Sequence, residues 1–190
     1  MPSPKNARPA LVAIFGATGD LTKRKLVPAL FNLWRDGQMP AEFRIVGIAR
    51  RKTLDEFLTD MRAGLDKFSR SAKATDEEWA AFSAKIRYVV GDYDGDDLYR
   101  EIAREVDELE ATAGEADRGY YLSTPPELFG PIAGKLGAAG LNRQEDRDRI
   151  VIEKPFGTDL ASAEALNREL LDTFREPQIY RIDHYLGKET

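Results

Sequence analysis

The chain has 190 residues, a length typical of one domain, with 42% hydrophobic and 32% charged residues and a formal net charge of −5. An acidic chain is a poor candidate for binding the phosphate backbone of nucleic acids. Because the sequence has no cysteine, disulfides, thiolate catalysis and zinc–cysteine sites are excluded. The first residues lack a signal-peptide core, and the longest apolar run, Ala10–Phe15, is too short to cross a membrane. These features predict a cytoplasmic α/β domain.

Short runs rich in β-branched and apolar residues alternate with amphipathic stretches along the chain. Six runs are predicted strands: Ala10–Phe15, Phe43–Ile48, Ile86–Val90, Gly119–Leu122, Arg149–Ile152 and Ile179–Ile182. Two stretches within them, Leu11–Phe15 and Ile150–Ile152, are apolar throughout, which suits a parallel sheet covered on both faces.

The stretches between these strands carry helix signals. A helix is expected after Phe15, and Thr53–Glu56 and Thr75–Glu78 are capping boxes. Apolar residues at helical spacing form stripes that we expect in the core: Leu54, Phe57, Leu58, Met61, Leu65 and Phe68; Leu98, Ile102, Val106 and Leu109; Leu160, Ala163, Leu166, Leu170 and Phe174. The alternation predicts one doubly wound, Rossmann-like domain over residues 1–182, a six-stranded parallel sheet with helices on both faces.

A glycine-rich turn, Gly16–Gly19, joins the first predicted strand to the first predicted helix. Glycine lets the backbone approach a pyrophosphate, and a helix N-terminus presents unpaired N–H groups to it. The pattern is weak by itself, and its place between strand and helix is what favours a dinucleotide site. A P-loop is excluded because position 21 is Leu rather than Gly. A short-chain reductase is disfavoured because no tyrosine has a lysine four residues later.

The residues after the second predicted strand indicate which dinucleotide would bind. NAD sites usually carry Asp or Glu there, which binds the ribose hydroxyl. Here the strand leads to Arg50 and Arg51. A guanidinium would pair with a 2′-phosphate, and a hydrogen bond to a charged group is worth about 1.5–3 kcal/mol. Two arginines can also simply solvate a strand end, but beside the glycine turn they favour NADP, with Thr18 as a further hydroxyl.

The segment Gly91–Asp97 contains four aspartates and invites comparison with a calcium loop. An EF-hand needs glycine at its sixth position, whereas that position is Asp97 here. We interpret the segment as a turn and helix N-cap after the third strand, and we expect no metal site.

The last ten residues, Arg181–Thr190, hold the only histidine of the sequence. They place an acid, an imidazole, a phenol and an ammonium close together: Asp183, His184, Tyr185 and Lys188. Several donors acting at once are what a phosphate requires, so this segment suits the binding of a small phosphorylated substrate.

Three separated motifs together resemble the N-terminal half of the glucose-6-phosphate dehydrogenases. They are Gly16–Leu26 (GATGDLTKRKL), Glu153–Gly157 (EKPFG) and Arg181–Glu189 (RIDHYLGKE), with Gly47–Arg50 and Tyr121–Pro126 in order between them. The resemblance extends over essentially the whole chain from residue 10. It implies an oxidoreductase of glucose metabolism, in the pentose phosphate pathway, that oxidises C1 of glucose 6-phosphate to the lactone and passes hydride to NADP.

The resemblance also assigns cofactor residues. Gly16, Thr18, Gly19, Asp20 and Leu21 would hold the dinucleotide, and Arg50 would bind its 2′-phosphate. Lys154 would lie between nicotinamide and sugar and touch both, although by itself it is compatible with a solvated lysine at a strand end. It follows a predicted strand at the carboxyl end, where doubly wound sheets bind ligands, and the next residue, Pro155, could be cis.

For the substrate, the resemblance implies that His184, Tyr185 and Lys188 bind the 6-phosphate and that Asp183 orients the catalytic base. In the family this base is a second histidine, in a larger C-terminal α+β domain. Since the sequence has one histidine, we expect residues 183–190 to begin a substrate domain otherwise absent from it. The chain alone would then bind NADPH better than NADH and show almost no turnover, and a homo-oligomer is expected only of the full-length enzyme. The alternative is a free-standing NADP-binding regulatory module, which has no need of the substrate motif.

Overall fold

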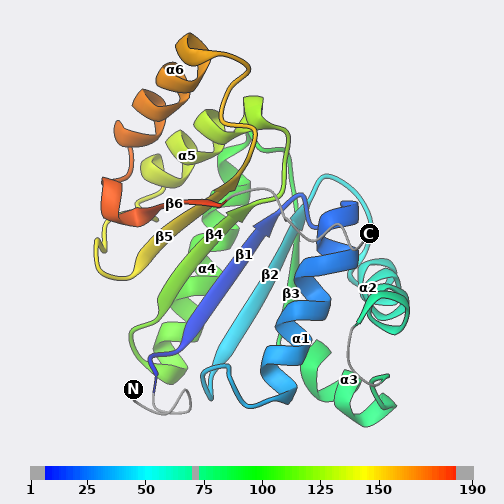
Figure 1. Cartoon of the computed structure of the whole chain (residues 1–190). Coiled ribbons are helices and arrows are strands. Elements are labelled where there is room, and N and C mark those ends of the chain that lie inside the picture. Colours follow the sequence, from blue (N-terminus) through cyan, green and yellow to red (C-terminus); the bar gives the residue numbers. More distant parts are fainter. Residues whose placement is uncertain (1–6, 70–72, 183–190) are drawn as a thin grey trace.

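The computed structural model describes residues 7–69 and 73–182 and has a six-stranded, wholly parallel sheet at its centre (Figure 1). In chain order the strands are β1 (Ala10–Phe15), β2 (Phe43–Ala49), β3 (Ile86–Val90), β4 (Asp117–Leu122), β5 (Asp148–Glu153) and β6 (Ile179–Ile182). Their spatial order is β3-β2-β1-β4-β5-β6, so the direction of winding reverses next to β1. This is the strand order of the doubly wound dinucleotide-binding fold, and it confirms the predicted fold class.

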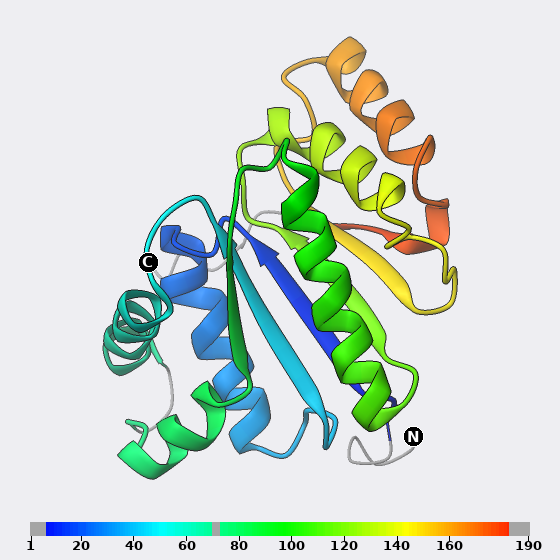
Figure 2. The same ribbon diagram turned by 180° about the vertical axis from the view of Figure 1, so that it is seen from behind.

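Helices cover both faces of the sheet, as Figures 1 and 2 show from opposite sides. One face carries α1 (Val27–Arg35), α2 (Leu54–Phe68) and α3 (Asp76–Ser83), and the other carries α4 (Asp96–Ala113), α5 (Phe129–Ala138) and α6 (Leu160–Leu171). Shorter helical turns are η2 (Thr22–Leu26), η3 (Pro126–Leu128) and η4 (Glu176–Gln178). Alternate side chains of β1 supply both cores: Leu11 and Phe15 belong to the cluster with α4 and α5, and Ile14 to the cluster with α1 and α2.

The predicted elements agree with the structure except at some ends and in one helix. β2 continues to Ala49, β4 begins at Asp117, and β5 is one residue longer at each end than predicted. Both capping boxes are confirmed, at the starts of α2 and α3. No pattern in the sequence delimits α5, because its three glycines and Pro131 lower its helix propensity. The burial of its side chains against the sheet compensates, since Ile132 and Leu136 are fully enclosed.

Two leucines expected in the core lie at the surface instead. Leu54 is 40% exposed and Leu160 is 75% exposed. Each is the first residue of its helix, α2 or α6. Helical periodicity identifies the face of a helix that meets the core but not the point along its length where that contact begins, which explains both errors.

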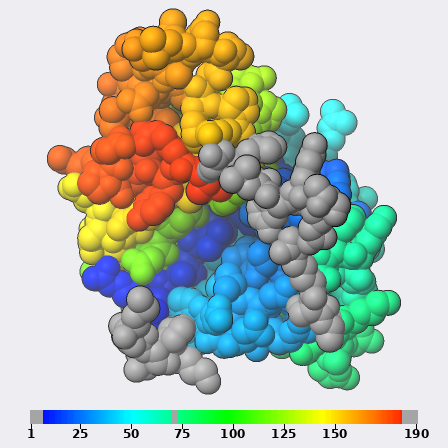
Figure 3. Space-filling view, in the orientation of Figure 1, coloured from blue at the N-terminus to red at the C-terminus, as the bar shows by residue number. Residues whose placement is uncertain are grey.

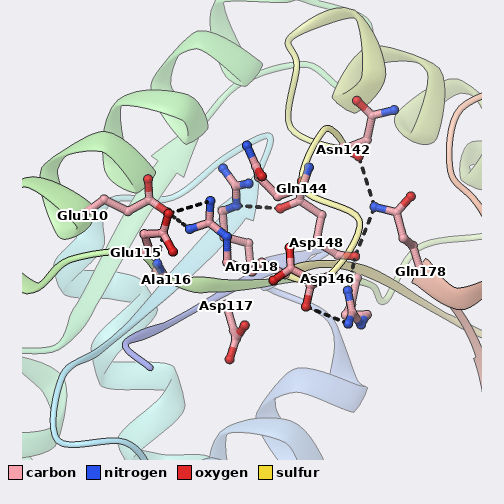
Figure 4. Close-up of polar contacts among 12 residues, drawn as sticks. Glu110, Glu115, Ala116, Asp117, Arg118, Asn142, Gln144, Asp146, Asp148 and Gln178 are labelled. Atoms are coloured by element: carbon pink, nitrogen blue, oxygen red, sulfur yellow. Dashed lines mark hydrogen bonds and ion pairs between the residues drawn. The ribbon is translucent and has the colours of Figure 1, made fainter. Parts of the chain in front are cut away.

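The amino ends of the strands are closed by buried ion pairs (Figure 4). Arg118 of β4 contacts the fully enclosed carboxylate of Asp148 of β5, with Nε and Oδ1 2.5 Å apart. Asp148 also accepts a hydrogen bond from the Gln144 N–H at 2.8 Å. Nearby, Arg147 pairs with Glu110 of α4 at 3.2 Å. These contacts hold β4, β5 and α4 together at the amino ends of the strands, which we call the amino edge of the sheet. The carboxyl ends of the strands, where the glycine turn lies, form the carboxyl edge.

On the face seen in Figure 3, β6 reaches the molecular surface (red). Its Tyr180 is 49% exposed, and within residues 7–69 and 73–182 no helix lies over β5 and β6 on this face. None of the helices in the described part of the chain combines the length and the apolar character that spanning a bilayer requires.

Candidate functional site

The glycine turn begins directly after β1, and its first residue must be glycine. Gly16 has φ +79°, in the left-handed region that glycine adopts at little cost. A Cβ atom there would lie 2.2 Å from the Ser123 carbonyl oxygen. Ser123 is held in place because its N–H donates to the Phe15 carbonyl at 3.0 Å. The segment after β4 therefore packs against the glycine turn. The carboxyl ends of the neighbouring strands β1 and β4 meet at this contact.

Backbone hydrogen bonds shape the turn and leave the start of the following helix open. The N–H groups of Gly16 and Ala17 both donate to the Ile48 carbonyl, at 3.1 and 3.0 Å. The first helical bond runs from the Lys23 N–H to the Gly19 carbonyl, at 3.2 Å. The amides of Asp20, Leu21 and Thr22 precede that bond and have no partner within the helix. The helix end therefore presents donors and a partial positive charge, as a phosphate requires.

This helix end differs from the starts of α2, α3 and α6, whereas α4 and α5 likewise begin without a side-chain cap. α2, α3 and α6 begin with capping boxes in which a side chain bonds the first amides. The residue before Asp20 is Gly19, which has no side chain that could do so. Thr18 and Asp20 are exposed, and Gly19 and Leu21 are half-buried. All five predicted residues of the turn thus line one short, accessible segment at the carboxyl edge of the sheet.

Arg50 follows β2, the strand next to β1, and therefore lies at the same edge. Its side chain is exposed. In the part of the chain that the structure describes, its guanidinium makes no ion pair and no hydrogen bond. A cation at the end of β2 is therefore available to an anionic ligand that occupies the glycine turn.

Tyr93, in the loop after β3, is a site residue that the sequence did not reveal. Its hydroxyl oxygen accepts a hydrogen bond from the Gly16 N–H at 3.0 Å. Its ring meets Phe15 edge to face, with centroids 6.0 Å apart. Burial raises the pKa of the Tyr93 phenol, while the Gly16 N–H and the nearby Arg50 charge act in the opposite direction. The predicted turn and helix start in Gly91–Asp97 are confirmed, but no pattern showed that this tyrosine reaches the glycine turn.

Lys154 follows β5, which is separated from β1 by β4. It is exposed at the same edge, and the Lys154–Pro155 peptide bond is cis. The residue before it, Glu153, accepts a hydrogen bond from the Tyr121 hydroxyl of β4. Burial and this carboxylate raise the pKa of Tyr121. A pocket of about 500 Å³ adjoins this loop, lined in part by Pro126, Pro155, Gly157 and Leu166.

The structure therefore brings seven predicted site residues to one edge: Gly16, Thr18, Gly19, Asp20, Leu21, Arg50 and Lys154. The other four, Asp183, His184, Tyr185 and Lys188, lie outside the described residues, directly after the end of β6 at Ile182. Within residues 7–69 and 73–182 no group of three or more His, Cys, Asp or Glu side chains is arranged to hold a metal ion. The edge is a set of backbone donors and cations suited to a phosphorylated ligand.

Several proteins of similar sequence are named glucose-6-phosphate 1-dehydrogenase. An enzyme of Bacillus subtilis, glucose-6-phosphate 1-dehydrogenase, is 44% identical over 95% of this chain, which covers 36% of that enzyme. Glucose-6-phosphate 1-dehydrogenase 5, cytoplasmic, of Arabidopsis thaliana is 40% identical over 94% of the chain and is likewise covered to 36%. A solved structure of glucose-6-phosphate dehydrogenase with its substrate glucose 6-phosphate is 35% identical, has a TM-score of 0.81, and matches 96% of this chain and 38% of that one.

The chain thus spans little more than a third of the length of these relatives. The model of the family described as glucose-6-phosphate dehydrogenase, NAD binding domain, matches residues 13–190. That range contains the glycine turn, the end of β2 and the loop after β5, where the structure gathers the candidate site. The chain therefore belongs to the family of glucose-6-phosphate dehydrogenase NAD-binding domains, which bind a nicotinamide dinucleotide.

Proposed function

We propose that this chain is the NADP-binding part of a glucose-6-phosphate 1-dehydrogenase. The observation that carries the proposal is the combination of the uncapped helix start at Asp20 with the exposed guanidinium of Arg50, which pairs with no group in residues 7–69 and 73–182. The first suits a pyrophosphate, and the second suits a 2′-phosphate that NAD lacks. Glycine at position 16 allows the tight turn that precedes this helix start, because its backbone is left-handed and Ser123 packs against it.

When bound, the nicotinamide supplies the hydride acceptor. The residues of this chain bind the dinucleotide and the substrate and orient them for the transfer. In the proposal Lys154, at the end of β5, contacts both nicotinamide and sugar. His184, Tyr185 and Lys188 bind the 6-phosphate of glucose 6-phosphate, and Asp183 orients the group that removes the proton from the C1 hydroxyl. Glucose 6-phosphate as the ligand is supported by the relative solved with that substrate.

In this proposal the proton acceptor is not one of residues 1–190. An imidazole with a pKa of about 6.5, held by a carboxylate, is suited to this step. The sequence has one histidine, His184, and the proposal uses it for the phosphate. We therefore propose that residues 183–190 begin a substrate-binding domain, that the 190-residue chain alone has almost no turnover, and that the longer enzyme is the homo-oligomer. A cytoplasmic location is proposed as well, because one relative carries that word in its name.

The cofactor assignment is tested by measuring the affinity of the chain for NADPH and for NADH by titration calorimetry. We expect NADPH to bind more tightly. Replacing Arg50→Ala should weaken NADPH binding about 10–150-fold, the equivalent of one charged hydrogen bond, and should leave NADH binding nearly unchanged. Arg104→Ala is the matched control, because that exposed arginine lies on α4, on the other face of the sheet. Equal binding of NADPH and NADH by the unmodified chain would contradict the proposal.

Turnover with glucose 6-phosphate tests the proposed substrate and the proposed inactivity of the 190-residue chain. Robust activity of the 190-residue chain would show that the proton acceptor lies within it. A protein whose sequence continues past Thr190 should reduce NADP in the presence of glucose 6-phosphate. If such a protein binds NADPH without turnover, the alternative of a regulatory module is favoured.

A further inference from the structure

Asp60, on α2, connects the two segments that form the phosphate side of the candidate site. Its carboxylate lies 3.5 Å from the Lys23 ammonium, in the helix that follows the glycine turn. It also pairs with the ammonium of Lys52, two residues after Arg50. All three side chains are about one-third exposed. One carboxylate therefore bridges the helix after β1 and the loop after β2.

The loop after β2 is held in an unusual conformation. Lys52 has φ +81° and is the only non-glycine with a positive φ in the described part of the chain. For a long side chain this conformation is disfavoured and requires support from its surroundings. The Lys52–Asp60 pair supplies one support. A second comes from the Tyr88 hydroxyl, which donates to the Arg51 carbonyl at 2.6 Å, and the Tyr88 ring stacks on Phe57 of α2 with centroids 4.7 Å apart.

The position of Asp60 relative to the glycine turn is fixed by close packing of α2. A Cβ atom at Gly64 would lie 2.4 Å from the Lys23 carbonyl oxygen, so the two helices touch through their backbones. Asp60 is four residues before Gly64 and therefore lies on the same face of α2. The close contact between Gly64 and Lys23 leaves α2 little room to shift, and this fixes the Asp60 carboxylate near Lys23 and Lys52.

We propose that Asp60 is a positioning residue that sets the preference of the site for a 2′-phosphate. By holding Lys52 in its left-handed conformation, it fixes the short loop that carries Arg50 at a set distance from the glycine turn. Arg50 has a long side chain and no partner of its own in the described residues, so the backbone that carries it decides where its guanidinium can act. This inference rests on the proposed function.

Positioning and simple electrostatics predict opposite results. Asp60 is an anion beside a site for anions, and it neutralises two lysines. If it acts by charge alone, Asp60→Asn leaves two unpaired ammonium groups and strengthens the binding of every phosphorylated ligand. If it positions the loop, the same substitution weakens binding only of ligands that carry the 2′-phosphate.

The test compares 2′,5′-ADP with 5′-AMP, which differ by that phosphate, in titrations of the 190-residue chain. For Asp60→Asn we expect the ratio of their affinities to fall about fivefold, the upper range for exposed ion pairs, while 5′-AMP binds as before. Asp60→Glu should retain the ratio because it keeps the carboxylate. Asp66→Asn is the control: it removes the same charge from α2, but Asp66 pairs with Arg62 of the same helix at 3.1 Å. A ratio that is unchanged or higher in Asp60→Asn would overturn the proposal.

A second measurement does not depend on the ligand. Amide hydrogen exchange of residues 50–53 in the free chain should be faster in Asp60→Asn than in Asp66→Asn, because the loop loses one of its supports. Exchange that is equal in the two variants would also overturn the positioning role. If the unmodified chain shows no preference for 2′,5′-ADP, the proposed cofactor is wrong, and the exchange rates still decide whether Asp60 holds the loop.

Discussion

Several charged side chains at the amino edge of the sheet are buried and paired, whereas those of the candidate site at the carboxyl edge are exposed. At the amino edge, Arg118 and Asp148 are buried and paired with each other, and Arg44 of β2 pairs with Glu105 of α4 at 2.7 Å with both side chains nearly enclosed. At the carboxyl edge, Arg50 is exposed and unpaired among the described residues, and the helix amides at Asp20 have no side-chain cap.

This difference favours the carboxyl edge as the place where a ligand binds. A buried charge needs a partner to offset its desolvation, and the two ion pairs of the amino edge supply such partners within the fold. The donors of the carboxyl edge are still available, and the carboxyl edge of a doubly wound sheet is where ligands bind. We therefore expect substitutions at the amino edge to alter stability, and substitutions at the carboxyl edge to alter binding as well.

The largest effect is expected at the amino edge, from Arg118→Met. Removing one partner of a buried ion pair leaves the other charge uncompensated, and this typically costs about 3–5 kcal/mol. The unfolding free energy, measured by urea denaturation, should fall by that amount. Under conditions in which the variant is folded, its affinity for NADPH should match that of the unmodified chain.

A double variant and an exposed arginine serve as controls for this prediction. Asp148→Asn added to Arg118→Met should recover much of the loss, because the amide is neutral and still accepts from the Gln144 N–H. Arg8→Met should have little effect, since Arg8 pairs with Asp146 at the surface. If Arg8→Met and Arg118→Met are equally costly, burial is not what distinguishes the amino edge.

A somewhat smaller loss of stability, together with loss of binding, is expected from Gly16→Ala at the carboxyl edge. The left-handed backbone costs a non-glycine residue about 1–2 kcal/mol, and the overlap with the Ser123 carbonyl adds about 1–3 kcal/mol. Gly37→Ala is the control, because Gly37 also has a positive φ, +67°, but has no atom within 4 Å of an added Cβ. Urea denaturation and NADPH titration of both variants would check the prediction; equal effects would mean that the contact with Ser123 is unimportant.

Much of the fold was predictable because it depends on local patterns. Apolar runs such as Leu11–Phe15 identify buried parallel strands, and the capping boxes at Thr53 and Thr75 identify helix starts. The nearness of the glycine turn to Arg50 was predictable because the carboxyl ends of parallel strands meet at one edge. The residues that lie at the carboxyl edge can therefore be predicted from the order of short motifs along the chain.

Other contacts depend on tertiary packing and were not predictable. Tyr93 reaches Gly16 across 77 positions of sequence, and the Arg118–Asp148 pair joins two strands at a register that no motif encodes. In the sequence, Asp60 is one acid on an amphipathic helix, and Arg118 is one arginine directly before the predicted strand Gly119–Leu122. Only the fold shows that the first bridges two lysines and that the second is buried.

The smallest expected effect is a difference in pH dependence between the two edges. Burial raises the pKa of the Asp148 carboxyl, whereas the hydrogen bond from Lys52 lowers the pKa of Asp60. Asp148 thus contributes stability at low pH that is lost as pH rises from about 3.9, the ordinary aspartate pKa, through its raised folded value. Asp60 contributes stability at neutral pH that is lost as pH falls through its lowered folded value.

Urea denaturation across this pH range, with Asp148→Asn and Asp60→Asn as neutral references, measures both contributions. The advantage of the unmodified chain over Asp148→Asn should shrink with rising pH, and its advantage over Asp60→Asn should shrink with falling pH. Carboxyl carbon NMR titration of the two residues would give the same order independently. Two slopes of equal sign would contradict the prediction, because burial raises the pKa of Asp148 whereas the hydrogen bond from Lys52 lowers the pKa of Asp60.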